Sequence, residues 1–403
     1  MNLLAYRDRD LFAQLRRKLL PELAEQTQAL GRRLRFMEVC GTHTVAFSKT
    51  GVRQVLAEHV ELISGPGCPV CVTDQTDIDH MIAFAKEAGA IVATFGDMMK
   101  VPGSTSSLYR QRAEGADVRV VYSPSQAVEI ARANPHRQVV FLGVGFETTA
   151  PSVALSIKKA ARERVGNYFV YSAHKLTPPA LQALLADPGH LLDGFFLPGH
   201  VSVIIGRRGW TLLESLNQPA VIGGFEPLDL LVSIYRLVRE LKRPRRSVIN
   251  NYPRIVREDG NPVAQAVLAD VFEVGEAAWR GFGTMAQSGL RIAPAYAAHD
   301  AATAIPIDRP LSKTVRGCRC GEVVKGKESP LQCALFATAC TPENPLGPCM
   351  VSTEGACSIY YQYERADRQD QGGGRDAHSA GPRGRGRPDP SADDGALSPG
   401  ILR

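Results

Sequence analysis

The sequence is poor in aromatic residues and has no long apolar stretch. Only 2 of its 403 residues are Trp, and aromatic residues make up 7%, which leaves little for the base-stacking surfaces of single-strand nucleic-acid binders. The net charge of +6 is spread along the chain, so we expect no nucleic-acid partner. No run without Asp, Glu, Lys or Arg reaches 18 residues, and the N-terminus is charged throughout. We therefore expect neither a membrane span nor a signal peptide.

Several catalytic motifs are also missing. The chain has no G-x-x-x-x-G-K-[ST] phosphate loop, no complete G-x-G-x-x-G after an apolar run and no H-E-x-x-H, so neither nucleotide binding nor zinc-peptidase activity has support. Its 44% hydrophobic and 22% charged residues are typical of a globular protein. The length predicts two to three domains.

The cysteines are the unusual feature. Of the nine, Cys40, Cys68 and Cys71 lie near the N-terminus, six lie between Cys318 and Cys357, and none lies between the two groups. An odd number without a secretory signal predicts a reducing cytoplasmic location, where clustered cysteines bind metals or carry out redox chemistry more often than they form structural disulfides.

The apolar pattern predicts an α/β fold with two lobes, each a parallel sheet of βαβ units, plus a third domain. Short apolar runs alternate with helical segments. The apolar runs cover residues 35–40, 59–65, 90–97, 118–123, 139–145, 168–174 and 194–200, and the last run continues into 201–206 as a strand. We expect the first lobe at 35–134 and the second at 135–245.

The remaining segments are predicted as follows. Residues 1–34 form one or two amphipathic helices, broken near Pro21, that pack on the C-terminal domain at 246–363. That domain opens with a helix over 261–281 and a short strand near 288–293. The segment 364–403 has 8 Gly and 4 Pro and is predicted to be a disordered tail.

Several predicted strands end in a polar, glycine-containing turn, which is where open parallel sheets bind their ligands. These turns begin at Cys40, Gly65, Gly96, Gly145, His174, Pro198 and Gly224. The number of such turns favours a shared functional rim over seven unrelated loops.

Two of these turns carry thiols. In GPGCPVC, Cys68 and Cys71 form a C-x-x-C pair at a strand-to-helix turn, within disulfide reach and stabilised as thiolates by the helix N-terminus; Thr73 or Asp74 would cap the helix that follows. In EVCGTH, Cys40 precedes His43 by three residues, which suits a nucleophile with its base or a soft iron ligand. A Cys3His zinc site from the same four residues is the alternative.

The second cysteine group favours an iron-sulfur cluster. Its members are Cys318, Cys320, Cys333, Cys340, Cys349 and Cys357. Four thiolates suffice for a cubane cluster, leaving two as a disulfide or redox partners. Zinc is the alternative, but the irregular spacings match neither ribbon nor ring knuckles.

Together, EVCGTHT, GPGCPVC, GFETTAP, HKLTPPA, FLPGHVSVIIG, GFEPLD and ACTPENPLGPCMVSTEGAC closely resemble the HypD family of hydrogenase maturation proteins, over about residues 5 to 363. The resemblance implies a three-domain α/β protein with a 4Fe-4S cluster. It also implies that, in complex with HypC, the protein is the scaffold on which the Fe(CN)2CO group of nickel-iron hydrogenases is assembled, rather than a turnover enzyme.

The resemblance also implies residue roles. Cys40 would hold the nascent iron, with its cyanide and carbon monoxide ligands, together with a cysteine of HypC, and His43 would lie close to it. Cys68 and Cys71 would be the neighbouring redox pair, and HypE would donate cyanide. Four of the six C-terminal cysteines would ligate the cluster, and the sequence leaves open which four.

Two other functions remain open at this point: a stand-alone thiol-disulfide oxidoreductase that depends on an iron-sulfur cluster, and a zinc-stabilised structural protein. The long Gly- and Arg-rich tail matches no motif of the family.

Overall fold

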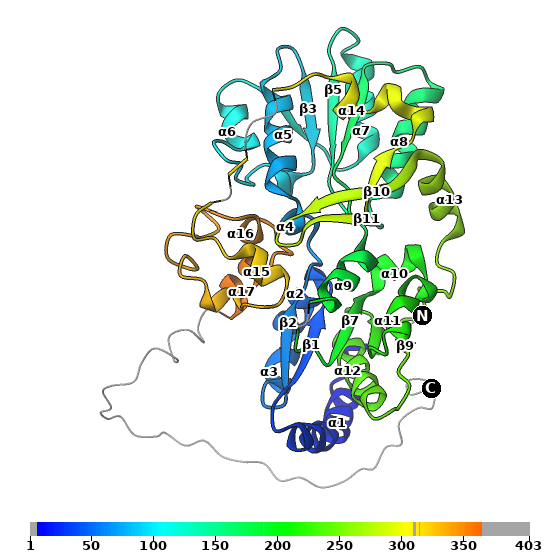
Figure 1. Ribbon diagram of the computed structural model, residues 1–403, viewed down its shortest axis with the longest axis vertical. Helices are drawn as coiled ribbons and strands as arrows, with labels where there is room; N and C mark the ends of the chain where they lie inside the picture. The colour runs from blue at the N-terminus through cyan, green and yellow to red at the C-terminus, as the bar shows by residue number, and fades with distance from the viewer. Residues whose placement is uncertain (1–5, 188, 309–311, 314, 365–403) are drawn as a thin grey trace.

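The computed structural model describes residues 6–187, 189–308, 312–313 and 315–364. They form two α/β lobes stacked along the long axis of the molecule, with a cysteine-bearing segment beside the junction (Figure 1). The predicted tail lies outside the described residues, apart from Glu364. No helix in these ranges is long and apolar enough to span a membrane.

The first lobe is built on five parallel strands in the order β2-β1-β7-β8-β9. Their bounds are Val60–Ser64, Leu34–Glu38, Gly194–Pro198, Ala220–Gly223 and Val248–Asn250. Alternate residues face opposite helical layers, as a pleated strand requires: Phe196 packs toward the N-terminal helices, whereas Phe195 and Leu197 face the other layer. Both faces are covered, which explains why these strands are apolar throughout.

Helices cover both faces of this sheet. On the Phe196 side lie α1 (Arg9–Leu30), α2 (Gly41–Lys49), α3 (Val52–Leu56) and α12 (Pro227–Leu241). On the other side lie α9 (Thr177–Leu185), α10 (Gly199–Ile205) and α11 (Thr211–Ser215), with a 3₁₀ turn at Arg207–Trp210.

The second lobe is built on four parallel strands in the order β4-β3-β5-β6. Their bounds are Asp117–Val120, Ile91–Thr94, Val139–Gly143 and Tyr168–Ser172. One face packs on α7 (Pro124–Ala133) and α8 (Ala150–Arg162), and the other on α5 (Gln75–Lys86) and α6 (Leu108–Ala113).

The parallel α/β architecture is as predicted, but the boundary between the lobes is not. The chain starts the first sheet, crosses after β2 to complete the second sheet, and returns at β7 (Figure 1). The predicted boundary between residues 134 and 135 therefore falls inside the second sheet. Apolar runs reveal the order of strands along the chain but not which strands pair in space.

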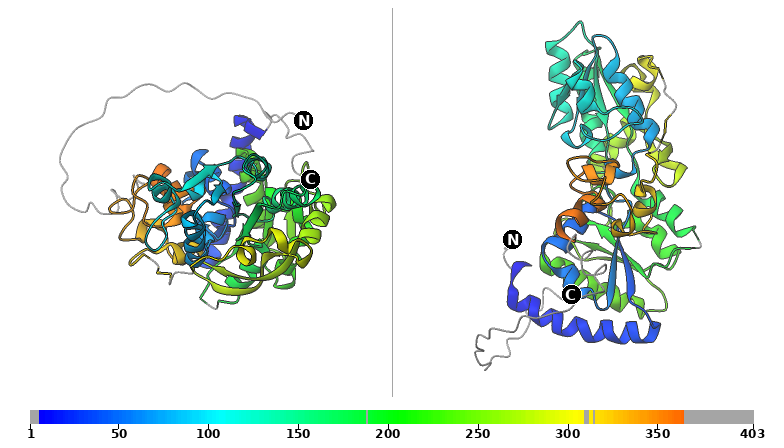
Figure 2. Two further views of the ribbon diagram at one scale, coloured as in Figure 1. Left: turned by 90° about the horizontal axis from the view of Figure 1, so that it is seen from above. Right: turned by 90° about the vertical axis from the view of Figure 1, so that its left-hand side faces the viewer.

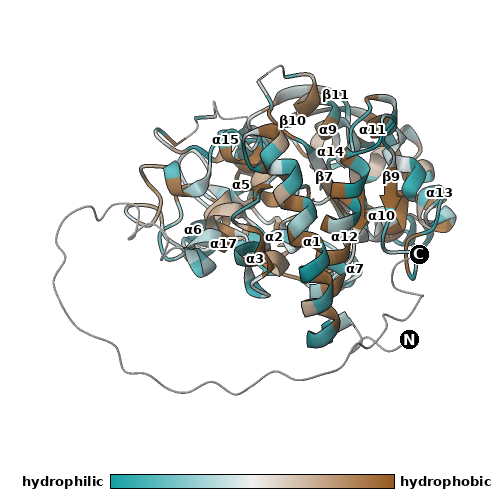
Figure 3. Ribbon diagram, turned by 90° about the horizontal axis from the view of Figure 1, so that it is seen from below, coloured by the Kyte–Doolittle hydropathy of each residue, from teal (hydrophilic) through white to brown (hydrophobic). Residues whose placement is uncertain are grey.

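Three local predictions also need correction. The helix α1 runs unbroken through Pro21, because Leu19 and Leu23 on either side are fully buried, and it packs on α12 rather than on the C-terminal domain (Figures 2 and 3). Residues 199–205 form the helix α10 instead of a strand. The predicted helix over 261–281 ends at Val271, where a strand begins.

The elements after residue 260 join the two lobes. After α13 (Pro262–Val271), the antiparallel hairpin of β10 (Phe272–Trp279) and β11 (Gly283–Ile292) reaches toward α4 (Pro69–Val72) (Figure 1). The predicted short strand near 288–293 belongs to β11. Residues 318–363, here called the cysteine segment, hold α15 (Cys320–Val324), α16 (Pro348–Val351) and α17 (Ala356–Tyr363). The remaining short elements are α14 (Ala301–Ala304) and 3₁₀ turns at Gly96–Met98, Pro294–His299 and Pro330–Gln332.

Candidate thiol and metal site

The predicted rim is divided between the two lobes. Four of its turns follow β1, β2, β7 and β8 in the first sheet, and three follow β3, β5 and β6 in the second. The cysteine segment contacts both groups. Thr42 of the first lobe donates a 2.6 Å hydrogen bond to Glu354, and Ser352 donates one of 3.2 Å to Asp97 of the second lobe.

Cys40 lies at the carboxyl end of β1, at the N-cap of α2, and its side chain is buried. Its Sγ is 3.7 Å from Nε2 and 3.9 Å from Nδ1 of His200, which follows the adjacent strand β7. Burial, with a further contribution from the negative charge of Glu354, raises the pKa of Cys40 to about 12. The free protein therefore holds Cys40 as a thiol at neutral pH.

His43 is also buried but is turned away from the sulfur of Cys40. Its Nε2 donates to the carbonyl of Gly224 at 3.1 Å, and its Nδ1 has no hydrogen-bond partner within the described residues. Phe225 stacks on His43 at 4.5 Å and on His200 at 5.6 Å between ring centroids. The imidazole beside Cys40 is thus that of His200, whereas His43 contacts Cys40 through its backbone N–H.

Cys68 and Cys71 are joined by a disulfide. Cys68 is the N-cap of the one-turn helix α4, and its sulfur accepts the backbone N–H of Cys71 at 3.2 Å. The next helix, α5, has Asp74 as its N-cap, one of the two predicted caps. The C-x-x-C pair is therefore at the strand-to-helix turn that its motif predicts.

Gly67 brings the disulfide turn against Cys40. A β-carbon on Gly67 would lie 2.0 Å from the carbonyl oxygen of Val39 and 2.4 Å from Cα of Cys40, so no other residue fits this position without moving backbone. The absence of a β-carbon at Gly67 thus allows the disulfide turn to approach the backbone of Cys40 closely.

The zinc alternatives lack a matching geometry. The disulfide uses the sulfurs of Cys68 and Cys71, which are two of the four ligands that the Cys3His site needs. Across the ranges that the structure covers, no group of three or more His, Cys, Asp or Glu side chains is placed to hold a single metal ion. A polynuclear cluster makes a different demand, because each protein thiolate binds a different iron.

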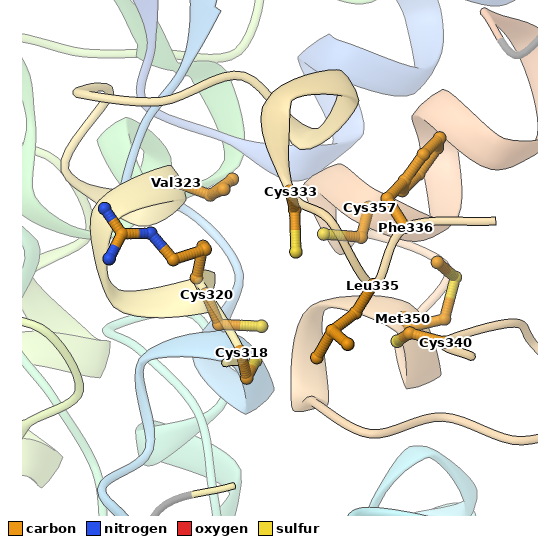
Figure 4. Close-up of a pocket in the computed structure, with 10 residues that line it drawn as sticks. Cys318, Cys320, Val323, Cys333, Leu335, Phe336, Cys340, Met350 and Cys357 are labelled. Atoms are coloured by element: carbon orange, nitrogen blue, oxygen red, sulfur yellow. The ribbon is translucent and has the colours of Figure 1, made fainter. Parts of the chain in front are cut away.

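The C-terminal cysteines surround a small, mostly apolar cavity. Five of the six line it, together with Val323, Leu335, Phe336 and Met350. Figure 4 shows the sulfurs of Cys320, Cys333 and Cys357 directed toward a common space. A ring of soft thiols in apolar surroundings fits the donor set of an iron-sulfur cluster.

Cys349 is the exception. It does not line the cavity, is fully buried in α16, and interacts with the thiols of Cys320 and Cys357. Gly347 makes room for two of the other thiols, since a β-carbon at this position would lie 2.6 Å from Sγ of Cys318 and 2.7 Å from Sγ of Cys320. The six thiols are therefore in two positions, five at the cavity and one behind it.

The fold unites the cysteines that the sequence separates. Cys68, Cys71 and all six C-terminal cysteines belong to, or pack against, a single apolar cluster, and α4 contacts both α15 and α16. Cys40 lies outside this cluster, on the other side of Gly67. The arrangement is one isolated thiol beside a disulfide that is itself next to a six-thiol segment.

Sequence reasoning identified Cys40, His43, Cys68 and Cys71 but left His200 undecided and missed Glu354 and Phe225. One signal was available: CGTH and PGH both follow strands, and their histidines converge if those strands are neighbours. Nothing in the sequence states that β1 and β7 pair.

The fold and the site define a two-lobed α/β protein with a thiol-rich centre where its sheets meet. The matching family model is described as the hydrogenase formation hypA family, under the name HypD, and covers residues 14–364. The chain belongs to the HypD family, and this membership supports a role as a hydrogenase maturation factor.

Individual relatives agree. The chain is 45% identical to hydrogenase maturation factor HypD of Rhodobacter capsulatus over 359 residues, covering 87% of this chain and 95% of the relative. It is 42% identical to the protein of the same name from Escherichia coli K12 over 367 residues, covering 90% and 98%. HypD of Cupriavidus necator H16 is 46% identical over 345 residues, covering 83% and 91%.

Proposed function

We propose that this protein is the scaffold for assembly of the Fe(CN)2CO group of nickel-iron hydrogenases. It holds the iron on Cys40 in complex with HypC, accepts cyanide from HypE, and supplies electrons through a 4Fe-4S cluster and the Cys68–Cys71 pair. The observation that carries the proposal is the juxtaposition of Cys40, across Gly67, with a disulfide that packs on the six-thiol segment.

The surroundings of Cys40 support its role as the ligand of the iron cargo. Iron with cyanide and carbon monoxide ligands favours a soft thiolate, and binding replaces the proton of a thiol whose pKa is about 12 in the free protein. The half-buried ring of His200 covers one side of the sulfur. A cysteine of HypC completes the thiolate ligands.

Five of the six C-terminal cysteines line the cavity, and four of these five thiols would ligate the resident cluster. Cys349 stands behind the cavity, in contact with both Cys320 and Cys357. When bound, the cluster supplies single electrons. The chain's own part is to keep that space apolar with Leu335, Phe336 and Met350.

The test compares Cys40→Ala with Cys333→Ala in protein purified anaerobically with HypC. Cys40→Ala should keep iron, sulfide and the visible absorption of a cluster, but lose the infrared bands of metal-bound cyanide and carbon monoxide and lose hydrogenase maturation. Cys333→Ala should show the opposite loss, with little cluster iron. Maturation retained in Cys40→Ala would refute the scaffold role of this thiol.

A second function, a stand-alone thiol-disulfide oxidoreductase, is favoured by the disulfide at the turn before α5. Unlike the scaffold, such an oxidoreductase needs no partner protein. Reduction of unrelated disulfide substrates at rates that do not depend on HypC or Cys40 would support it over the scaffold.

A further inference from the structure

The tip of the β10–β11 hairpin is wedged between the disulfide turn and the cysteine segment. On one side, Trp279 forms an antiparallel bridge with Thr73. On the other side, Gly281, which has a φ of +86°, lies close to Gly321. A β-carbon on Gly281 would lie 2.5 Å from the carbonyl oxygen of Gly321. Arg280 lies between these two contacts and therefore stands where the two thiol groups meet.

The side chain of Arg280 is a buried cation held by neutral partners. It is 8% exposed; its Nε donates to the carbonyl of Thr73 at 3.1 Å, and both terminal nitrogens lie 3.3 Å from Oε1 of Gln75. Its backbone N–H donates to the carbonyl of Val72 at 2.9 Å. Among the described residues it forms no ion pair with Asp or Glu, and an uncompensated buried charge is costly.

The missing negative charge has a source nearby. The guanidinium is bonded two residues beyond Cys71, and the Cys68–Cys71 pair acquires negative charge when it is reduced and its thiols ionise.

We propose that Arg280 is a positioning residue that docks the Cys68–Cys71 turn onto the cysteine segment and supplies the positive charge that stabilises the reduced state of the Cys68–Cys71 pair. This inference does not rest on the proposed function, because the disulfide and the contacts of Arg280 with Val72, Thr73 and Gln75 are independent of any cluster.

The proposal predicts the direction of a redox equilibrium. In a dithiol buffer, the Cys68–Cys71 bond breaks, its two sulfurs take up two electrons and two protons, and the dithiol is oxidised to a cyclic disulfide. A fixed positive charge near the turn stabilises the thiolate that either new thiol forms when it loses its proton, and so favours reduction. Removing the charge therefore makes the disulfide harder to reduce.

The experiment uses the full chain, equilibrated anaerobically in graded ratios of reduced and oxidised dithiothreitol and then alkylated. Mass spectrometry of the peptide that contains Cys68 and Cys71 gives the equilibrium constant. Arg280→Gln should lower it at least tenfold, which corresponds to about 30 mV for a two-electron couple. Arg280→Lys should stay within threefold of the unmodified protein, because it keeps the charge.

Two further variants complete the design. Gln75→Glu keeps Arg280 but places a carboxylate against its guanidinium, so it should shift the equilibrium in the same direction as Arg280→Gln. If circular dichroism shows that Arg280→Gln does not fold, Gln75→Glu alone tests the effect of the charge. Arg291→Gln, on the exposed side of the same hairpin and ion-paired with Glu276, is the matched control and should change nothing.

The idea is overturned if Arg280→Gln and Gln75→Glu both stay within threefold of the unmodified protein, or if Arg280→Lys is as impaired as Arg280→Gln. Iron and sulfide are measured on the same samples. Their absence from the unmodified protein would refute the proposed cluster while leaving the effect of Arg280 on the disulfide measurable.

Discussion

Three imidazoles lie at the ends of the strands; those of His43 and His174 are buried, and that of His200 is half-buried. The pKa of His43 is lowered to about 3, that of His174 to about 3 and that of His200 to about 4, in each case mainly because burial penalises the charged ring. His174 illustrates the cause. Its Nδ1 donates to Ser172, which in turn donates to the carbonyl of Leu290, and its Nε2 has no partner in the described structure. A second proton there would have no acceptor.

We expect this burial to make the protein sensitive to acid. The unfolded chain binds a proton at His174 below pH about 6.5, whereas the folded state does not until about pH 3. The free energy of unfolding therefore falls as the pH drops through that window. Between pH 7 and pH 5 His174 alone contributes a loss on the order of 2 kcal/mol.

Urea unfolding at both pH values measures this loss. In His174→Gln the difference in unfolding free energy between pH 7 and pH 5 should shrink by about that amount, since glutamine does not titrate in this range. An unchanged difference in the variant would show that His174 is not the source.

At the residue scale, the motifs predicted the thiols better than their surroundings. Cys40, Cys68 and Cys71 are identifiable because thiols after apolar runs are rare and specific. The closeness of His200 to Cys40 depends on the pairing of β1 with β7, which a local pattern does not contain. Likewise, Glu354 lies far along the chain from Thr42, and only the packing of the cysteine segment brings them together.

At the scale of elements, the ends of β1 and β2 explain the position of the redox turn. The two strands are paired along their whole length, so their following turns leave the sheet side by side. Gly67 lets these turns touch, because it offers hydrogen where any other residue has a β-carbon. The distance between Cys40 and the disulfide is thus set by one residue.

Gly67→Ala should separate the two turns and destabilise the protein by about 1–3 kcal/mol, since the added carbon would meet the backbone of Val39 and Cys40. Gly166→Ala is the matched control, because a β-carbon there meets nothing within 4 Å, and it should change stability by less than about 0.5 kcal/mol. Thermal unfolding of both variants checks the pair. Equal melting temperatures would contradict the packing described for Gly67.

Element types were predicted well where the apolar period was clear and poorly where it was ambiguous. The first runs from 35 to 174 did become parallel strands. The apolar run over 201–206 predicts the continuation of a strand, yet Gly199–Ile205 form the helix α10 directly after β7. A short apolar run does not by itself distinguish a strand from a buried helix.

At the scale of the whole molecule, the functional core ends at the last helix. Glu364 still contacts Arg53, with an Nε to Oε1 distance of 3.6 Å, and the family match also stops at residue 364. The residues beyond have few large aliphatic side chains.

Deleting residues 366–403 should leave both hydrogenase maturation and the unfolding free energy unchanged within about 0.5 kcal/mol. The deletion keeps Glu364 and its ion pair with Arg53. Maturation is assayed by hydrogenase activity in cells that carry only the shortened chain, and stability by urea unfolding. Lost maturation with unchanged stability would assign the tail a function of its own.

The domain boundaries were the least predictable feature. Composition changes little between residues 35 and 245, and both sheets are made of similar apolar strands, so the sequence offered no mark of the two crossings between lobes. Only the pairing of β2 and β7 on either side of β1 reveals them.

These crossings also determine the order in which the chain emerges during synthesis. The first sheet needs β1 and β2, but also β7, β8 and β9, which leave the ribosome only after the whole of the second sheet. Until β7 is made, Cys40 therefore lacks both the neighbouring strand of its sheet and the ring of His200 beside its sulfur.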